Sequence, residues 1–331
     1  MTRRAGIVEI AQRAGVSRQT VSRVLNSPHQ VRPETRERVM TVMAEVGYRR
    51  NYAARALVTQ QSALIGVLWT GAGYFGPSSL VASVEVAARA SGYATLVTVL
   101  NEQSEAEVDS AFATFRERDV EGIVVVAPHQ AMADMVRDRG AGTPVVVVAD
   151  MPLDAQLHVV AVEQRLGALD AVRHLVAQGA RRIAHVSGPL DWFDATERIE
   201  GWRLGLREAG LPEPPLLVGD WGPEAGYSIG GAMVASGDLP EAIFAANDLL
   251  ALGLLSAFHE AGVTVPRDVA LVGYDDIEPA GYFSPPLTTV RQPFDEVGVA
   301  VVAVLLRAIS GEPAQRVALA PTLVVRASSL L

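Results

Sequence analysis

The 331-residue sequence contains no cysteine, no lysine and no apolar run long enough to span a membrane. Without cysteine, the chain can form neither a disulfide nor a thiolate metal site. A transmembrane helix needs about 20 consecutive apolar residues, and no stretch approaches that length. The chain from Met1 to Gly6 leads directly into a helical pattern, without the hydrophobic segment of a secretory signal. These absences predict a cytoplasmic protein.

The sequence also lacks the common cofactor motifs. It has neither the glycine-rich fingerprint of a dinucleotide site nor a phosphate-binding loop. Its six histidines show no spacing that is typical of metal ligands. We therefore expect no cofactor and no metal.

Charge is distributed unevenly along the chain. The first 60 residues hold eleven arginines against four glutamates, although the whole chain has a formal net charge of −9. A basic N-terminal segment on an acidic body predicts that this segment alone binds a polyanion. The length of the chain and its 49% of hydrophobic residues predict two or three globular domains.

The stretch from Ile7 to Asn26 has the pattern of two short helices joined by a tight turn. Apolar residues recur every three and four positions from Ile7 to Ala14, which predicts one apolar helix face. Gly15 can adopt the left-handed conformation that ends a helix, and Ser17 is a favourable N-cap for the next helix. A third helix is predicted over residues 33–46.

The second helix of this pattern has a polar outer face. Val21, Val24 and Leu25 point inward, which leaves arginine and glutamine side chains outside. Arginine can donate two hydrogen bonds to guanine, and glutamine can pair with adenine, in the major groove of DNA. The alternative is a helical hairpin with a solvated polar face. The residues that we predict to contact DNA are Ser17, Arg18, Gln19, Thr20, Ser22, Arg23 and Asn26.

This stretch resembles the helix-turn-helix headpiece of the LacI–GalR family of bacterial repressors. The matching residues are Val8-x-x-Ala11, Ala14-Gly-Val-Ser17 and Thr20-Val-Ser-Arg-Val-Leu-Asn26. The resemblance implies a DNA-binding headpiece over residues 1–50. It also implies a hinge helix over residues 51–61 that folds on the operator, where Ala54 and Leu57 reach the minor groove. The alternative for Leu57 is a plain linker residue.

From residue 62 onward, short apolar runs alternate with amphipathic helices, which predicts parallel sheets covered by helices on both faces. Ligands bind such sheets beyond the carboxyl ends of the strands. The predicted strands are 63–69, 95–100, 122–127, 145–149, 183–187, 242–246, 269–274 and 322–326. The predicted helices are 80–90, 105–118, 164–178, 195–209, 224–235 and 249–261.

Several polar residues follow these apolar runs directly. Asp150, Asn247 and Asp275 each come just after a predicted strand, and Arg198 lies in the first turns of a predicted helix. Carboxylates, an amide and a guanidinium group together bind vicinal hydroxyl groups well. An aromatic ring such as that of Trp221 can cover the apolar face of a sugar. The predicted ligand is therefore a small sugar.

The family resemblance extends over nearly the whole chain and assigns the remaining ligand residues. It implies a fold with two similar α/β subdomains, like that of periplasmic sugar-binding proteins. The first would contain about residues 62–162 and 292–322, and the second about 163–291 and 323–331. The implied ligand-binding set is Tyr74, Pro77, Leu80, Asp150, Asp194, Arg198, Trp221, Asn247, Asp275, Gln292 and Phe294.

Three positions depart from a galactoside-binding member of the family. Asp194 replaces a serine, Val126 replaces an asparagine, and Trp192 replaces a small residue. We favour Asp248 and Asp276 as caps of the helices that follow them, whereas their preceding neighbours would contact ligand. Alternatives remain: Arg198 can serve as a structural ion pair with Asp194 or Asp275, and Trp221 can belong to the core.

The combined prediction is a homodimeric transcriptional repressor with an α + α/β fold, which binds double-stranded operator DNA. A small sugar, β-galactoside-like, would release it. Alternatives are a different β-glycoside as effector, a corepressor, a sugar-binding protein, or a glycoside-acting enzyme that uses Asp150 and Asp275. A dimer is expected because no leucine-heptad tail follows the last predicted strand.

Overall fold

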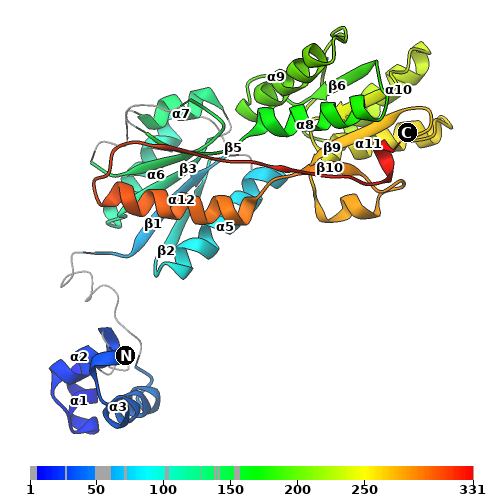
Figure 1. Cartoon of the computed structure of the whole chain (residues 1–331). Helices are drawn as coiled ribbons and strands as arrows, with labels where there is room; N and C mark the ends of the chain where they lie inside the picture. Colours follow the sequence, from blue (N-terminus) through cyan, green and yellow to red (C-terminus); the bar gives the residue numbers. More distant parts are fainter. Residues whose placement is uncertain are drawn as a thin grey trace. The chain divides into compact units, whose positions relative to one another are not determined.

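The structure is a computed structural model that describes residues 6–26, 28–48, 61–70, 73–100, 104–127, 129–137, 139, 142–152 and 157–330. The chain divides into two compact units, Met1–Gln61 and Ser62–Leu331 (Figure 1). In the described part of the chain, no helix has the length and apolar character needed to traverse a lipid bilayer.

The first unit is a small helical headpiece with one apolar core. Its helices are α1 (Ile7–Ala14), α2 (Arg18–Asn26), the 3₁₀ helix η1 (Pro28–Gln30) and α3 (Pro33–Glu45). Gly15 ends α1 with φ 63°, and its N–H donates to backbone carbonyls of the last turn. The core is built from Ile10, Ala11, Ala14, Val21, Val24, Val39, Val42 and Met43.

The first subdomain of the second unit contains a six-stranded parallel sheet. Valine dominates its central strands, as expected for a sheet that is buried on both faces. In spatial order the strands are β11 (Arg316–Leu319), β5 (His158–Val162), β4 (Val145–Val148), β3 (Gly122–Val126), β1 (Leu64–Trp69) and β2 (Ala94–Val99).

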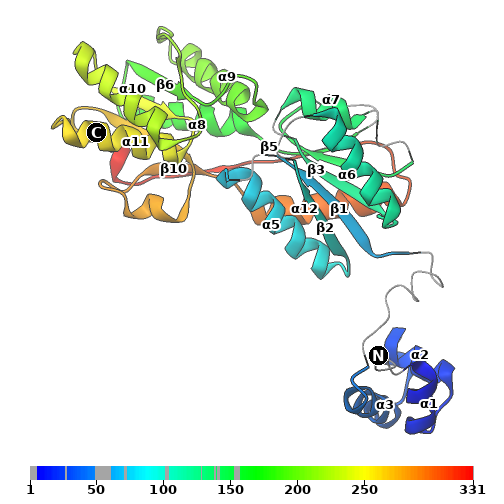
Figure 2. The ribbon, with the colours of Figure 1, turned by 180° about the vertical axis from the view of Figure 1, so that it is seen from behind.

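Helices cover both faces of this sheet (Figures 1 and 2). Helices α5 (Phe75–Ala90) and α12 (Phe294–Ile309) pack side by side on one face, where they enclose a valine-rich core. Helices α6 (Glu105–Glu117) and α7 (Gln130–Arg137) cover the other face, around the rings of Phe112 and Phe115.

The second subdomain contains a similar six-stranded sheet, in which only β12 runs antiparallel to its neighbour. Helices α8 (Gln164–Ala177) and α9 (Phe193–Glu208) cover one face. Helices α10 (Pro223–Ser236) and α11 (Asp248–Glu260) cover the other. The strands are β12 (Thr322–Val324), β10 (Thr288–Arg291), β9 (Ala270–Asp275), β8 (Ala242–Ala245), β6 (Ile183–Ser187) and β7 (Leu217–Val218).

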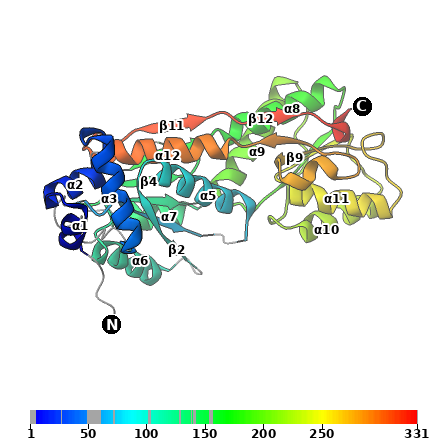
Figure 3. The ribbon, with the colours of Figure 1, turned by 90° about the horizontal axis from the view of Figure 1, so that it is seen from below.

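The chain passes between the two subdomains three times. The crossings lie between β5 and α8, between β10 and α12, and between β11 and β12. The first two can be followed in Figure 1 and the third in Figure 3. Because of these crossings, α12 packs in the first subdomain although β10, just before it, belongs to the second. The predicted fold class, a helix-turn-helix headpiece followed by two α/β subdomains, is confirmed.

Candidate functional site

The outer face of α2 presents polar side chains to solvent. Ser17, Arg18, Gln19 and Arg23 are exposed, and Thr20 and Ser22 are half-buried. Val21 and Val24 are buried on the opposite face, at 0% and 5% exposure. Asn26 lies in α2, but its side chain is outside the described part of the structure, as are Ala54 and Leu57.

The polar residues of this helix differ in their hydrogen bonding. Ser17 caps the helix, since its Oγ accepts from the backbone N–H of Thr20 at 3.1 Å. Its hydroxyl also lies 2.9 Å from that of Thr20. Among the described residues, no group pairs with the side chains of Arg18, Gln19 or Arg23. These three side chains are therefore free to reach the edges of bases.

A second candidate site lies between the two subdomains, where two adjoining cavities share residues from both. Together with the solvent-open space at their mouths, the first comprises about 470 Å³ and the second about 380 Å³. Each of the eleven residues predicted to bind ligand lines at least one of the two cavities. Tyr74, Arg198, Trp221, Asn247 and Asp275 line the second, and the other predicted residues line the first or both.

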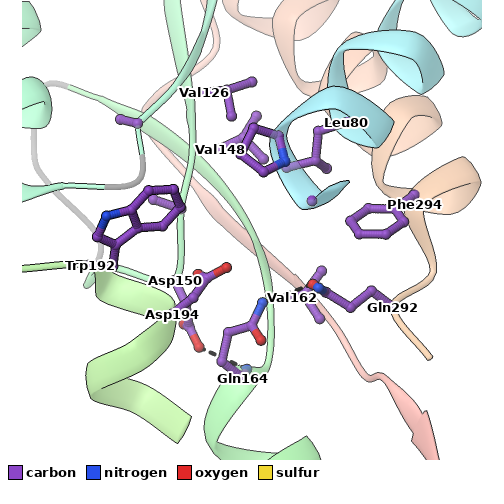
Figure 4. A pocket seen from close by; sticks show the side chains of 14 residues that line it. Leu80, Val126, Val148, Asp150, Val162, Gln164, Trp192, Asp194, Gln292 and Phe294 are labelled. Carbon is purple, nitrogen blue, oxygen red and sulfur yellow. Dashed lines mark hydrogen bonds between the residues drawn. The ribbon is translucent and has the colours of Figure 1, made fainter. Parts of the chain in front are cut away.

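The wall from the first subdomain is apolar. Leu80, Val126, Val148 and Val162 line the first cavity, and Phe294 at the start of α12 closes its side (Figure 4). Val126 is the last residue of β3 and is buried. The galactoside-binding pattern has an asparagine at this position, so the wall is apolar here where that pattern would place a polar group.

Opposite this wall, a chain of hydrogen bonds joins Arg198 to Asp275. Arg198 Nε donates to Gln164 Oε1 at 3.0 Å, and Gln164 Nε2 donates to Gln292 Oε1 at 2.9 Å. Gln292 Nε2 then donates to Asp275 Oδ1 at 2.7 Å. Arg198 Nη2 lies 3.7 Å from the same oxygen, which nearly closes a ring. These buried polar groups hold each other in position.

Gln164 is the member of this network that sequence reasoning missed. It follows β5, a strand that the apolar pattern did not predict, and it is the first residue of α8. Its side chain is 2% exposed and lines the first cavity. Had β5 been predicted, the rule that ligands bind beyond the carboxyl ends of strands would have pointed to the two residues that follow it, Glu163 and Gln164.

Arg198 is held deep in the second subdomain, at 3% exposure. Besides its bond to Gln164, its Nη1 donates to the backbone carbonyl of Ala246 at 2.5 Å. Its guanidinium carbon lies 3.7 Å from the centre of the Tyr274 ring. The ion pairs with Asp194 and Asp275 are both 3.7 Å long and involve Nη2. Nη2 is thus the part of Arg198 that remains for a ligand.

Asp150 has structural partners as well as a place in the cavity wall. Its Oδ2 accepts from the backbone N–H of Gln164 at 3.0 Å, at the beginning of α8. Its Oδ1 pairs with Arg316 Nη2 at 2.7 Å. Burial raises the pKa of Asp150, and the bonds to Gln164 and Arg316 oppose that rise. Burial likewise raises the pKa of Asp194, which Arg198 opposes.

The prediction that Asp248 caps α11 is wrong. Asn247 is the N-cap instead: its Oδ1 accepts from Leu250 N–H at 2.8 Å, and its Nδ2 donates to the Trp221 carbonyl at 3.0 Å. Asn247 has the extended backbone that a cap requires, with φ −150° and ψ 173°.

Asp248 lies one residue later and is fully buried. Its Oδ1 accepts from the Thr289 hydroxyl at 2.5 Å, and its Oδ2 accepts from Ile277 N–H at 2.9 Å. Burial, together with the nearby charge of Asp275, raises the pKa of Asp248 to about 8. The side chain of Asp248 therefore connects the start of α11 to Thr289 of β10 and to the backbone of Ile277 after β9, instead of capping α11.

Asp276 is not a helix cap either. Its carboxylate binds Arg291 Nε at 2.6 Å and Arg326 Nη2 at 2.7 Å, and the 3₁₀ helix η2 (Glu278–Tyr282) begins after Ile277 without a side-chain cap. The backbone of Asp275 has φ 109° and that of Asp276 has φ 53°. Residues other than glycine rarely adopt positive φ values. Such backbone strain clusters at ligand sites. Burial raises the pKa of Asp275 to about 6.

Aromatic rings form the remaining wall. Trp221 is 5% exposed and also lines the second cavity, so it belongs both to the core and to the site. A side chain at Gly188 would clash with its ring at 2.4 Å. The Trp192 ring meets the rings of Tyr74, His129 and Trp221 with centroids 4.8–5.2 Å apart. Trp192 therefore bridges the two subdomains.

Two family descriptions match parts of this chain. Residues 6–51 match "Bacterial regulatory proteins, lacI family", and residues 172–329 match "Periplasmic binding protein-like domain". The description of the first match agrees with the exposed polar face of α2. In the described residues, no group of three or more histidine, aspartate or glutamate side chains could hold a metal ion.

Relatives cover nearly the whole chain. The ribose operon repressor of Escherichia coli (strain K12) is 33% identical over 98% of this chain and 100% of its own. The lactose operon repressor of the same strain, to which the sequence motifs point most directly, is 31% identical over 98% of this chain and 90% of its own. The PurR repressor of Erwinia tasmaniensis (strain DSM 17950 / CFBP 7177 / CIP 109463 / NCPPB 4357 / Et1/99) is 33% identical over 98% of this chain and 96% of its own.

Solved structures are also similar to this chain over nearly its whole length. The lac repressor dimer bound to operator and the anti-inducer ONPF aligns with a TM-score of 0.86 and 31% identity, over 99% of this chain and 100% of that chain. The complex of the transcriptional regulator CelR with cellobiose aligns with a TM-score of 0.73 and 29% sequence identity, over 98% of this chain and 100% of that chain. The relatives named above are repressors, so the enzyme hypothesis based on Asp150 and Asp275 is set aside. The chain belongs to the LacI family of bacterial regulatory proteins and is a transcriptional repressor.

Proposed function

We propose that the protein binds a palindromic operator as a homodimer, represses sugar-utilisation genes, and is released by a small β-galactoside-like sugar. The headpiece supplies the DNA contacts through Arg18, Gln19 and Arg23, whose side chains are exposed and unpaired among the described residues. A two-fold dimer matches the symmetry of a palindrome. A solved lac repressor dimer bound to operator supports this assembly by likeness.

The observation that carries the effector proposal is the convergence of all eleven predicted residues on two adjoining cavities. Trp221 offers an aromatic face, while Arg198 Nη2 and the carboxylate of Asp275 offer a donor and acceptors. Vicinal hydroxyls of a sugar can satisfy such a pair, since each hydroxyl both donates and accepts. Relatives have been solved with cellobiose and with the galactoside ONPG.

Release follows from the position of the cleft between two subdomains. A sugar that contacts both walls favours one subdomain arrangement over others, and only a difference in affinity between states shifts their populations. An inducer must bind the DNA-incompetent state more tightly. We place the hinge of residues 51–61 between this change and the DNA. Residues 51–60, Leu57 among them, lie outside the described residues.

A different β-glycoside, or a corepressor, is the second candidate for the effector. Val126 and Asp194 differ from the galactoside-binding pattern, and both line the first cavity. One of the relatives is named as the repressor PurR and not as the repressor of a sugar operon, which supports keeping other effectors as candidates. A corepressor would bind the DNA-competent state more tightly, so it would strengthen rather than weaken operator binding.

Fluorescence anisotropy tests this proposal with the full-length protein and a labelled palindromic operator taken from near its own gene. One sugar of a panel of β-galactosides and other β-glycosides should release the DNA. The Asp275→Ala variant should bind the same DNA and stay bound. Failure to bind any palindrome near the gene would contradict the DNA-binding part. DNA binding that no sugar changes would contradict the effector part alone.

A further inference from the structure

The carboxylate of Asp194 faces the cleft without a hydrogen-bond donor. It lines both cavities, and its side chain is 33% exposed (Figure 4). Within the described part of the chain, no group donates a hydrogen bond to it. Its ion pair with Arg198 Nη2 spans 3.7 Å, beyond the range of an ordinary hydrogen bond. The acceptor capacity of Asp194 is therefore open to a ligand.

The charges around the two cavities do not balance. Asp150, Asp194 and Asp275 line them, together with Arg198. Asp150 has its own partner, Arg316, at 2.7 Å. Asp194 and Asp275 are left to share one guanidinium group, each 3.7 Å from Nη2. With both carboxylates ionised, one negative charge is therefore in excess. A buried carboxylate in excess is relieved either by taking up a proton, which the raised pKa values of Asp194 and Asp275 favour, or by a ligand that supplies a cation.

Aromatic rings stand beside these carboxylates. Tyr74, Trp192 and Trp221 line the second cavity together with Asp194 and Asp275. The Trp192 ring meets that of Tyr74 at 85° and that of Trp221 at 66°, each with centroids 5.2 Å apart. Rings that meet at such angles present surfaces in different directions, and the face of an aromatic ring attracts cations. Aromatic walls combined with free carboxylates are the chemistry that binds an organic ammonium group.

We propose that the effector is a sugar that carries a protonated primary amine, with its ammonium group held by Asp194 beside the ring of Trp192. The inference rests on the proposed function, because it assumes that a sugar occupies the cleft. Arg198 Nη2 and the Asp275 carboxylate remain for the hydroxyl groups of the ring. A neutral sugar could donate a hydroxyl to Asp194, but it would leave the excess negative charge uncompensated.

Intrinsic tryptophan fluorescence of the full-length protein tests the inference without DNA, because Trp192 and Trp221 line the second cavity. The probes are galactosamine, glucosamine and mannosamine, each compared with its neutral parent and with its N-acetyl derivative. N-acetylation keeps the nitrogen but removes its charge. At least one amino sugar should bind roughly tenfold or more tightly than both neutral forms, since hydrogen bonds between charged groups are the strong ones.

Two variants assign the preference to one side chain. Asp194→Asn keeps the shape and removes the charge, so the amino sugar and its neutral parent should bind it within about twofold of each other. Asp191→Asn is the matched control. Asp191 lies just before α9, three residues from Asp194. Its side chain is 70% exposed and lines neither cavity, so this variant should keep the full preference.

Three results would overturn the inference: equal or tighter binding of the neutral parent sugars, an undiminished preference in Asp194→Asn, or no binding of any amino sugar. Operator anisotropy in parallel separates this failure from failure of the proposed function. If a neutral sugar releases the DNA while no amino sugar binds, the inference fails and the proposed function stands. If an amino sugar binds but never releases the DNA, the inference stands and the proposed mechanism of release fails.

Discussion

The polar side chains of the headpiece and those of the cleft are arranged in opposite ways. On α2, the side chains of Arg18 and Gln19 are exposed, and no described group pairs with them. In the cleft, Arg198, Gln164 and Gln292 are buried and bonded to one another. The headpiece therefore keeps its donors for a partner, whereas the cleft uses most of its donors to maintain its own shape.

This difference has an energetic consequence. A solvated donor on α2 exchanges water for a base, so its removal affects DNA binding and leaves the fold intact. A buried donor in the cleft also satisfies its neighbours, so its removal leaves them with unmet hydrogen bonds. Substitutions in the cleft should therefore change stability and ligand binding together, and substitutions on α2 should change DNA binding alone.

The largest effect is expected for Arg198→Ala. The change leaves Asp275 and Asp194 without their shared cation, and it leaves Gln164 without its donor. Removal of one partner of a buried ion pair costs about 3–5 kcal/mol. The free energy of unfolding in urea should fall by that amount, and effector binding should be lost.

The matched control is Arg173→Ala. Arg173 bridges α8 and α9 through Glu208 at 2.9 Å, but both side chains are well exposed. This variant should lose far less stability than Arg198→Ala, because solvent screens the pair. Equal losses in the two variants would show that the buried network has no special role.

A second effect concerns Asp248 and pH. Its pKa is about 8 in the folded chain and ordinarily 3.8, so between these values the folded state holds a proton that the unfolded state has released. Stability should therefore fall as pH rises through this window, by up to about 1.4 kcal/mol per pH unit, and level off above pH 8.

Asp248→Asn isolates this contribution. The amide can accept from Ile277 N–H and donate to the Thr289 hydroxyl, so the local geometry is preserved. Urea unfolding at pH 5, 6, 7 and 8 should show a smaller decline in the variant than in the parent chain. Parallel declines would contradict a protonated Asp248.

On the headpiece, Arg18→Ala should weaken operator binding by about 1–3 kcal/mol if the side chain contacts a base pair through two hydrogen bonds. Unfolding of the chain and binding of its effector should be unchanged, since Arg18 has no partner among the described residues. Arg13→Ala is the control, because Arg13 pairs with Glu9 on α1 at 2.7 Å. Anisotropy with one operator measures both variants. A similar loss in each would indicate general charge rather than base contact.

Much of the fold was predictable because its local signals agree. The turn at Gly15 and the cap at Ser17 defined the headpiece, and alternating apolar runs indicated parallel sheets. The sequence pattern did not reveal β5, β7, β10, β11, α7 or α12. Helix α12 is rich in valine, which favours strands, so its sequence alone did not indicate a helix; in the structure its apolar residues pack in the valine-rich core beside α5. The two residues of β7 give no periodic signal.

The candidate cleft was predictable where a residue follows a recognisable strand, as Asp150 and Asp275 do. Gln164 escaped because β5 before it was not recognised. Asp248 was misassigned because two adjacent residues, Asn247 and Asp248, both suit a helix cap. The choice between them depends on Thr289 and Ile277, which are distant in sequence. Contacts of that kind leave no local pattern to read.

The smallest effect tests a headpiece residue that, like those of the cleft, forms a hydrogen bond within the protein. Ser17→Ala removes the acceptor for Thr20 N–H, and loss of such a cap costs about 1 kcal/mol. Amide hydrogens of α2 in the full-length chain should exchange roughly fivefold faster, while those of the second unit should not change. Thr41→Ala, which removes a hydroxyl bonded to the Glu37 carbonyl within α3, should leave α2 unaffected. Unchanged exchange in α2 of Ser17→Ala would mean that Ser17 does not stabilise the helix and remains available for DNA.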